Sequence, residues 1–345
     1  MYEVTLMTIL STLLPTELKQ TIRALLFLPR RLNELLSNYF YDMQRFLKHS
    51  SVLQFFDSKQ QLLSWIDADL HKIEKALALS EPKPGFGQGV AERLVRQILL
   101  YENKYGDNPS IQTSIDVLRI YKKFNLEHEV IYTKLFEDIE HLSHLHKKAH
   151  VNGGYDELSK QSWLDAARQD LVPFFKSRRS VRNFSDQEID FTLIEKAVEM
   201  AMYTPTVCNR QAVKVHAFTA KESRERVLSC QMGNAGFGHQ AKSALVITVD
   251  RECFFTAGER NQCWIDGGLF SMSLVYALHS LGLGTCCLNW SVTKERDKVL
   301  RSVIDIKDSE AVIMMIAVGH LKEHFKVAKS ARKSIEHFLS YEKLK

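Results

Sequence analysis

Two continuous apolar segments in the second half of this 345-residue chain, 244–250 and 311–319, determine the fold class that the sequence predicts. Both are short and rich in Val and Ile, as buried strands are. A long apolar helix is expected between them over 263–281, and an amphipathic helix over 190–204 precedes a short strand over 213–218. Strands that alternate with helices in this way predict a sheet covered by helices.

The first half of the chain has a helical pattern instead. Apolar residues recur at helical spacing over 32–39, 62–70, 90–101, 111–124 and 128–146. We therefore expect an all-α domain over 1–165 and a second domain over 166–345.

Prolines and glycines mark the breaks between these helices. Pro82–Gly87 and Asp107–Ser110 are expected to end helices, with Ser110 as a candidate cap. The aromatic-bearing loop at Pro82–Gly87 could cap a partner's active site, but a helix end with a surface turn is the reading we favour. Val151–Gly154 is the candidate linker, followed by one more helix to about Lys176.

Composition narrows the functional classes. The net charge of +5 is mild and not clustered, so we expect no nucleic-acid partner. All six cysteines follow residue 200, and their spacing matches neither a zinc ribbon nor a CxxC redox site. The pair His146 and His150 has a metal-compatible spacing, but no carboxylate pattern accompanies it, and we assign no metal. With no secretory signal apparent, a cytoplasmic protein with reduced thiols is expected.

Two apolar segments near the N-terminus raise the question of membrane contact. The segment 4–14 is followed by Glu17 and Lys19, well short of the roughly 20 residues that a spanning helix needs. The segment 24–31 either lies at a membrane surface or forms a buried helical face. We expect the buried face, and no membrane association.

The segment Ser177–Phe184 gathers three arginines, Arg178, Arg179 and Arg182, around Ser180. Guanidinium groups bind phosphate through paired, charge-assisted hydrogen bonds, and a serine hydroxyl adds another. Taken alone, such a turn is more often a solvated basic surface than a ligand site.

Three further segments follow this turn in order: Thr204–Gln211, Gly282–Trp290 and Lys329–Lys333. The first is a polar loop after a helix, the second a glycine stop with an extended segment, and the third a basic segment near the C-terminus. Together the four segments, over about 170–335, resemble the nitroreductase family of FMN-dependent oxidoreductases. The family's proline after the glutamine is replaced by Ala212, and of its Gly-Tyr-Pro only Gly319 is present.

The resemblance implies a fold and a set of cofactor-binding residues. The fold is an α+β, three-layer FMN-binding domain, with a central, mainly antiparallel sheet flanked by helices, after the all-α N-terminal domain. Arg178, Arg179 and Ser180 would contact the FMN phosphate or ribityl chain, and Arg182 the flavin N1 and C2 carbonyl. The remaining positions implied by the family are Pro205, Thr206, Asn209 and Gln211 in the second segment, Cys287, Leu288 and Asn289 in the third, and Lys329 and Arg332 in the fourth.

The function implied is two-electron hydride transfer between NAD(P)H and a small-molecule acceptor, in a homodimer with FMN at the shared interface. Asp266-Gly-Gly268 would lie at that interface, although close packing in the core explains these glycines equally well. Cys286 and Cys287 are expected to pack rather than to react, and no catalytic side chain is assigned. The alternative is a flavin-binding sensor or an interaction protein whose helical half docks a partner or a membrane surface.

Overall fold

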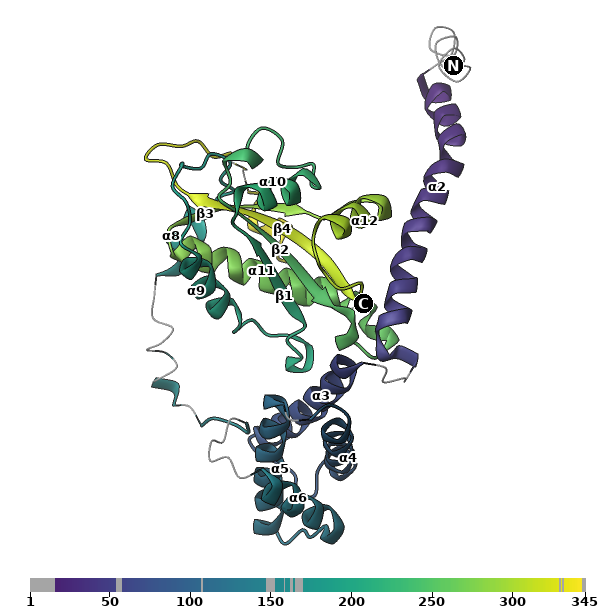
Figure 1. Cartoon of the computed structure of the whole chain (residues 1–345), viewed down its shortest axis with the longest axis vertical. Helices are drawn as coiled ribbons and strands as arrows, with labels where there is room; N and C mark the ends of the chain where they lie inside the picture. The colour runs from purple at the N-terminus through teal and green to yellow at the C-terminus, as the bar shows by residue number, and fades with distance from the viewer. Residues whose placement is uncertain are drawn as a thin grey trace.

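The computed structural model describes residues 16–53, 58–106, 108–146, 153–157, 159–161, 164, 170–328, 330 and 332–342. Three parts can be followed in Figure 1: a long N-terminal helix, a group of helices, and a sheet covered by helices on both faces. The side chains of the first helix are described from residue 29 onward.

The group of helices in the first half has a core of its own. It consists of α3 (Lys59–Leu77), α4 (Gln88–Tyr105), α5 (Pro109–Glu127) and α6 (Thr133–Leu145). Their apolar stripes meet in one cluster of buried side chains, the largest of which include Leu62, Ile66, Leu94, Ile98, Tyr101, Ile115 and Tyr121. The helical prediction for this half is therefore confirmed for the residues that the structure describes.

Helix α2 (Thr16–His49) stands apart from this group and lies beside the sheet (Figure 1). It contains Pro29 and leads through η1 (Ser51–Leu53) to α3. The backbone N–H of Ser51 donates to the carbonyl of Phe254 at 2.9 Å, which ties the end of this connection to the sheet domain.

The sheet has four strands, all antiparallel to their neighbours, in the order β1-β2-β4-β3. They are β1 (Val213–Phe218), β2 (Ser243–Asp250), β3 (Leu283–Asn289) and β4 (Glu310–His320). The two continuous apolar segments of the sequence are β2 and β4, the two central strands. Their side chains are buried on both faces, which explains why these segments do not alternate with polar residues.

Helices cover both faces of the sheet. Helices α9 (Phe191–Ala201) and α11 (Gln262–Ser280) pack on one face, and α10 (Lys221–Ser229) and α12 (Lys294–Val303) on the other. The remaining elements are short: α8 (Leu171–Ser177), η2 (Val207–Asn209), η3 (Gly238–Gln240), η4 (Arg251–Cys253), η5 (Ala257–Asn261) and η6 (Ile335–His337). The prediction of a three-layer α+β domain with an antiparallel sheet is confirmed.

Several boundaries differ from the prediction for local reasons. The cap of α5 is Asn108, whose side chain accepts from the N–H of Ser110, so Ser110 itself is not the cap. Helix α6 begins only at Thr133, because Glu129 has a φ of 60°, which a helix cannot accommodate. Helix α9 ends at Ala201, three residues before the predicted end and ahead of Pro205.

The predicted division of the chain, between residues 165 and 166, falls within 165–169, which is outside the described residues. Val151 and Asn152 of the candidate linker are also outside them. Residues 29–31, the described end of the N-terminal apolar segment 24–31, are exposed rather than buried.

Candidate functional site

The segment Ser177–Phe184, called the arginine turn below, lies along the edge strand β3. After α8 the chain is extended, Ser180 forms a bridge with Thr285, and the N–H of Val181 donates to the Thr285 carbonyl at 2.8 Å. Gly284 makes this close approach possible, because a Cβ there would lie 3.2 Å from that of Val181. In the same way, a Cβ on Gly319 would lie 2.6 Å from the ring of Phe184, so Gly319 provides the space for this ring.

The turn presents three guanidinium groups without a carboxylate partner. In the part of the chain that the structure describes, no ion pair involves Arg178, Arg179 or Arg182. The Nε atom of Arg178 is buried and has no hydrogen-bond partner, and the Arg182 guanidinium lies 5.9 Å from the ring centroid of Phe237. Unneutralised cations gathered within five residues favour an anionic ligand such as a phosphate.

The free edge of β3 adds backbone donors beside these arginines. In a strand, the backbone N–H and C=O groups of every second residue point to the same edge. Because the Thr285 carbonyl faces the turn, the N–H groups of Cys287 and Asn289 point to that same free edge. The N–H of Leu288 faces β4 instead, and its side chain is buried against α10 and α12. The Asn289 carbonyl accepts from the Gln231 side chain at 3.0 Å.

Neither cysteine of β3 has the properties of a reactive thiol. Burial raises the pKa of Cys286, with Arg182 opposing it, and desolvation together with Cys286 raises the pKa of Cys287, with Arg178 opposing it. Both thiols therefore stay protonated near neutral pH, whereas a nucleophile must be a thiolate.

The second segment, Thr204–Gln211, forms a tight loop around η2 ahead of β1. The hydroxyl of Thr206 accepts from the N–H of Gln211 at 3.1 Å, and the Thr206 carbonyl accepts from the N–H of Asn209 at 3.1 Å. Cys208, Asn209 and Gln211 have φ values of 48°, 51° and 49°, in the left-handed region. Side chains other than glycine are uncommon there, and such strain is concentrated at functional loops.

Arg210, which the sequence reasoning did not select, anchors this loop. Its buried guanidinium pairs with Glu259, donates to the Cys253 carbonyl at 2.6 Å and stacks on Phe255, 4.5 Å from the ring centroid. Burial alone would raise the pKa of Glu259, but the hydrogen bond from Arg210 holds it below its usual value. A single basic residue between Asn209 and Gln211 was the only signal in the sequence.

The structure does not bring the two segments together within one chain. The loop leads into β1 and the arginine turn flanks β3, and these strands are the opposite edges of the sheet. Thr206 and Gln211 instead line a cavity of about 690 Å³ between α9 and β1, and the three arginines are not among its lining residues.

Of the fourth segment, Lys329 lies outside the described residues. Arg332 is exposed and donates to the carbonyl of Ser330 at 2.9 Å. No contact links it to the arginine turn among the residues described.

Of the two features noted in the helical half, the loop Pro82–Gly87 packs against α5, and the histidine pair is described only at His146. Phe86 packs edge-on against Tyr121 at 5.2 Å, and the N–H of Gly85 donates to Asn125, so the Pro82–Gly87 loop is fixed to α5. His146 pairs with Glu102, and His150 is outside the described residues. The described ranges contain no group of three or more side chains able to hold a metal ion.

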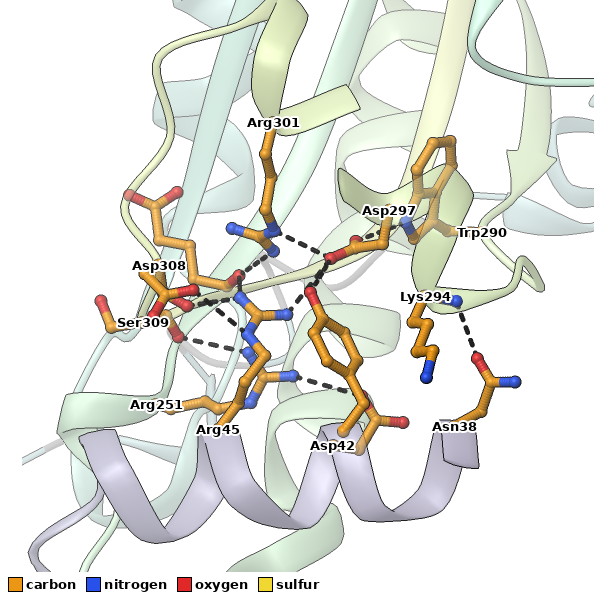
Figure 2. A network of polar contacts seen from close by, with 12 residues as sticks. Asn38, Asp42, Arg45, Arg251, Trp290, Lys294, Asp297, Arg301, Asp308 and Ser309 are labelled. Atoms are coloured by element: carbon orange, nitrogen blue, oxygen red, sulfur yellow. Dashed lines mark hydrogen bonds and ion pairs between the residues drawn. The ribbon is translucent and has the colours of Figure 1, made fainter. Parts of the chain in front are cut away.

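Helix α2 is joined to α12, the helix that follows β3, by a network of polar contacts (Figure 2). One carboxylate oxygen of Asp297 accepts from Tyr41 at 2.9 Å, from Arg45 at 3.3 Å and from Arg301 at 2.8 Å. The other accepts from the indole of Trp290 at 3.0 Å, and Trp290 is the residue after Asn289. Burial would raise the pKa of Asp297, but these hydrogen bonds hold it below its usual value.

Further contacts extend the same junction. Asn38 accepts from the N–H of Lys294 at 2.7 Å, and Arg45 also donates to the carbonyls of Asp308 and Glu310. The Arg251 guanidinium lies 4.0 Å from the Asp42 carboxylate, and burial lowers the pKa of Arg251 to about 10. The N-terminal helix is therefore fixed to the segment that directly follows the free edge of β3.

The model of the nitroreductase family matches this chain over 175–232 and 226–320. The matched segments contain the arginine turn, the loop around η2, all four strands and the free edge of β3. Residues 175–320 belong to the nitroreductase family. We call this matched segment the nitroreductase domain, and its family is one of oxidoreductases.

Relatives of the nitroreductase domain are distant in sequence. Proteins of Methanothermobacter thermautotrophicus and Archaeoglobus fulgidus, both with the provisional name NADH dehydrogenase/NAD(P)H nitroreductase, are 24% and 26% identical over 46% and 45% of this chain, and over 81% and 87% of their own lengths. Among solved structures, the FMN-dependent nitroreductase of Clostridium difficile R20291 has a TM-score of 0.43 and 22% identity, over 50% of this chain and 99% of its own.

Proposed function

We propose that this protein is an FMN-dependent oxidoreductase that transfers a hydride between NAD(P)H and a small-molecule acceptor. One observation carries the proposal: Arg178, Arg179 and Arg182, which have no carboxylate partner among the described residues, lie beside the free backbone edge of β3. This combination fits a ligand that has a phosphate at one end and a polar ring edge at the other.

Each group has a role that follows from its chemistry. Arg178, Arg179 and Ser180 would bind the phosphate and the ribityl chain, and Arg182 would place a positive charge beside the flavin ring. FMN, when bound, supplies the reversible storage of two electrons. The free N–H groups at Cys287 and Asn289 would hydrogen-bond the ring edge, and no acidic or basic side chain is needed for the transfer.

We further propose that the complete site forms only in a homodimer. Asn209 and the arginine turn lie at opposite edges of the sheet, so the loop that complements one turn comes from a second copy. Helix α11 supports this arrangement, because Ile265, Leu269 and Met272 on its outer side are exposed although they are apolar. A two-fold dimer would contain two equivalent sites.

The visible spectrum of the purified protein, before and after anaerobic NADH and NADPH, tests the function. A yellow protein whose flavin bands bleach is the expected result. Bound flavin that neither nucleotide reduces would contradict the donor and support a sensor. A colourless protein that cannot take up FMN would contradict the function itself.

Mixing two variants tests the shared site. Arg182→Ala and Asn209→Ala should each bind FMN poorly, because each damages both sites of its own homodimer. After mixed refolding, heterodimers have one site with both defects and one intact site, so about a quarter of all sites should regain normal binding. No recovery, with heterodimers demonstrated, would show that each site is built within one chain.

We also propose the division near residue 165 as a domain boundary. The cluster of α3 to α6 supports it, because these helices bury a core of their own. Limited proteolysis of the full chain should cut first between residues 146 and 170. Primary cuts within α3 to α6 would contradict the division.

A further inference from the structure

Helix α2 docks on the nitroreductase domain with its polar face. The side chains that make the contacts are Asn38, Tyr41 and Arg45, at the i, i+3 and i+7 positions of one helical face (Figure 2). Lys48 and His49 extend this face and bond to Asp308. An amphipathic helix usually turns its apolar side to its own domain, so α2 is inverted.

The opposite side of α2 is apolar and exposed. This apolar face consists of Leu32, Leu35, Leu36, Tyr39, Phe40, Met43 and Leu47, all of which are exposed. Leu36 is 58% exposed and Tyr39 is 68% exposed, whereas Phe46, near the C-terminal end of the helix, packs against the core around Phe254. Seven contiguous large apolar side chains are more than a soluble monomer ordinarily presents to water.

We propose that the apolar face of α2 binds the surface of a lipid bilayer, with the helix lying in the plane of the interface. The face is wide: at 100° per residue, the side chains from Leu35 to Phe40 cover about 140° of the helix. The seam between two paired helices is narrower, whereas a flat interface accepts a stripe of this width.

The sequence beyond the described side chains continues the apolar character. Residues 25–28 are Leu-Leu-Phe-Leu, and 4–14 is largely apolar. Arg30 and Arg31 are exposed, which places two cations at the N-terminal end of the face, where lipid phosphates would lie. The N-terminal part of α2 extends beyond the sheet domain (Figure 1).

The structure favours lying on the bilayer over crossing it. Among the described residues, no helix combines the length and the apolar character that a membrane span requires. The docked polar face keeps the nitroreductase domain on the aqueous side of α2. Binding of α2 to a bilayer would differ from the expectation, based on short apolar segments, that the chain has no membrane association.

Flotation of the full chain with vesicles tests the proposal. The vesicles are pure phosphatidylcholine and a mixture of phosphatidylcholine with phosphatidylglycerol. The test variant is Leu36→Glu with Phe40→Glu, and the matched control is Asn33→Glu with Gln44→Glu, which adds the same charge at exposed polar positions of the same helix. We expect wild type and control to float, and the test variant to lose at least about tenfold in partitioning.

Three results would overturn the proposal. One is wild-type protein that stays at the bottom of the gradient with both vesicles. A second is equal flotation of the test variant and the control, which would assign binding to another surface. The third is an oligomer of wild type that the test variant dissociates, without vesicle binding, which would assign the face to a second copy. Circular dichroism and the thermal midpoint show that each variant is folded, and the readout does not depend on flavin.

Discussion

Arg45 of α2 and Asp297 of α12, 252 residues apart in the chain, form an ion pair of 3.3 Å in which both side chains are at most one tenth exposed. The pair connects the N-terminal helix to the segment that follows β3. It also explains why α2 shows its apolar face to the outside, since its polar face is used by this junction.

Asp297→Asn should destabilise the protein strongly. The change leaves Arg45 and Arg301 buried with one counter-charge fewer, which costs about 3–5 kcal/mol when one partner of a buried pair is removed. Urea unfolding followed by circular dichroism measures the loss. As a control, Asp138→Asn breaks the exposed pair with Lys134 and should cost only about 0.5 kcal/mol. Equal losses for both variants would contradict the importance of the junction.

Arg178→Ala should weaken FMN binding without unfolding the domain. A hydrogen bond to a charged group contributes about 1.5–3 kcal/mol, so the Kd should rise about tenfold or more. Titration of the flavin-free protein with FMN, followed by flavin fluorescence, gives this value. Arg226→Ala, which removes an exposed arginine on α10, should leave the Kd unchanged. An unchanged Kd in Arg178→Ala would remove Arg178 from the phosphate site.

Asp67 should make stability depend on pH. Burial raises its pKa to about 7 in the folded chain, against 3.8 for a free carboxyl. As pH rises from about 4 to about 7, the unfolded chain releases this proton while the folded chain retains it, so stability falls at about 1.4 kcal/mol per pH unit at most. Below this window both states are protonated, and the contribution is constant.

Asp67→Asn should remove that slope, which urea midpoints between pH 4 and pH 8 would reveal as a growing advantage over wild type. As a control, the urea midpoints of Asp186→Asn, which changes an exposed carboxyl, should show the same pH dependence as those of wild type. A constant difference between Asp67→Asn and wild type across the whole range would refute the raised pKa.

Substituting alanine for each of two neighbouring glycines of α11 should change the stability of the protein in opposite directions. A Cβ on Gly267 would lie 2.5 Å from Ile313 and 2.9 Å from Val249, whereas a Cβ on Gly268 meets nothing within 4 Å. Overpacking should make Gly267→Ala less stable by about 1–3 kcal/mol. Gly268→Ala should gain up to about 1 kcal/mol, because alanine favours a helix. Thermal midpoints decide this, and destabilisation by both would place Gly268 in a packed interface.

The sequence predicted the sheet domain well where strands are buried on both faces. The strand predicted at 213–218 has the same bounds in the structure, and the two apolar segments are the central strands β2 and β4. Buried strands have a continuous apolar signal that depends on few neighbours. The order of the motifs led to the family for the same reason, since each motif is local.

Properties that depend on distant partners could not be read from the sequence. The spacing of Leu32, Leu36 and Tyr39 predicts a helix but not which side meets the domain, because that depends on Asp297, more than 250 residues later. Arg210 was missed since its partners Glu259 and Cys253 come from another segment. The separation of the two motifs follows from strand order, which local patterns do not encode.

The strand order has a consequence for how the cofactor is retained. If β1 of one chain and β3 of another must meet before FMN is held, the flavin content obeys mass action in protein as well as in flavin. Dilution of the protein would then cause FMN to dissociate even when the concentration of free FMN is held constant. The yellow colour would thus report how many chains are paired.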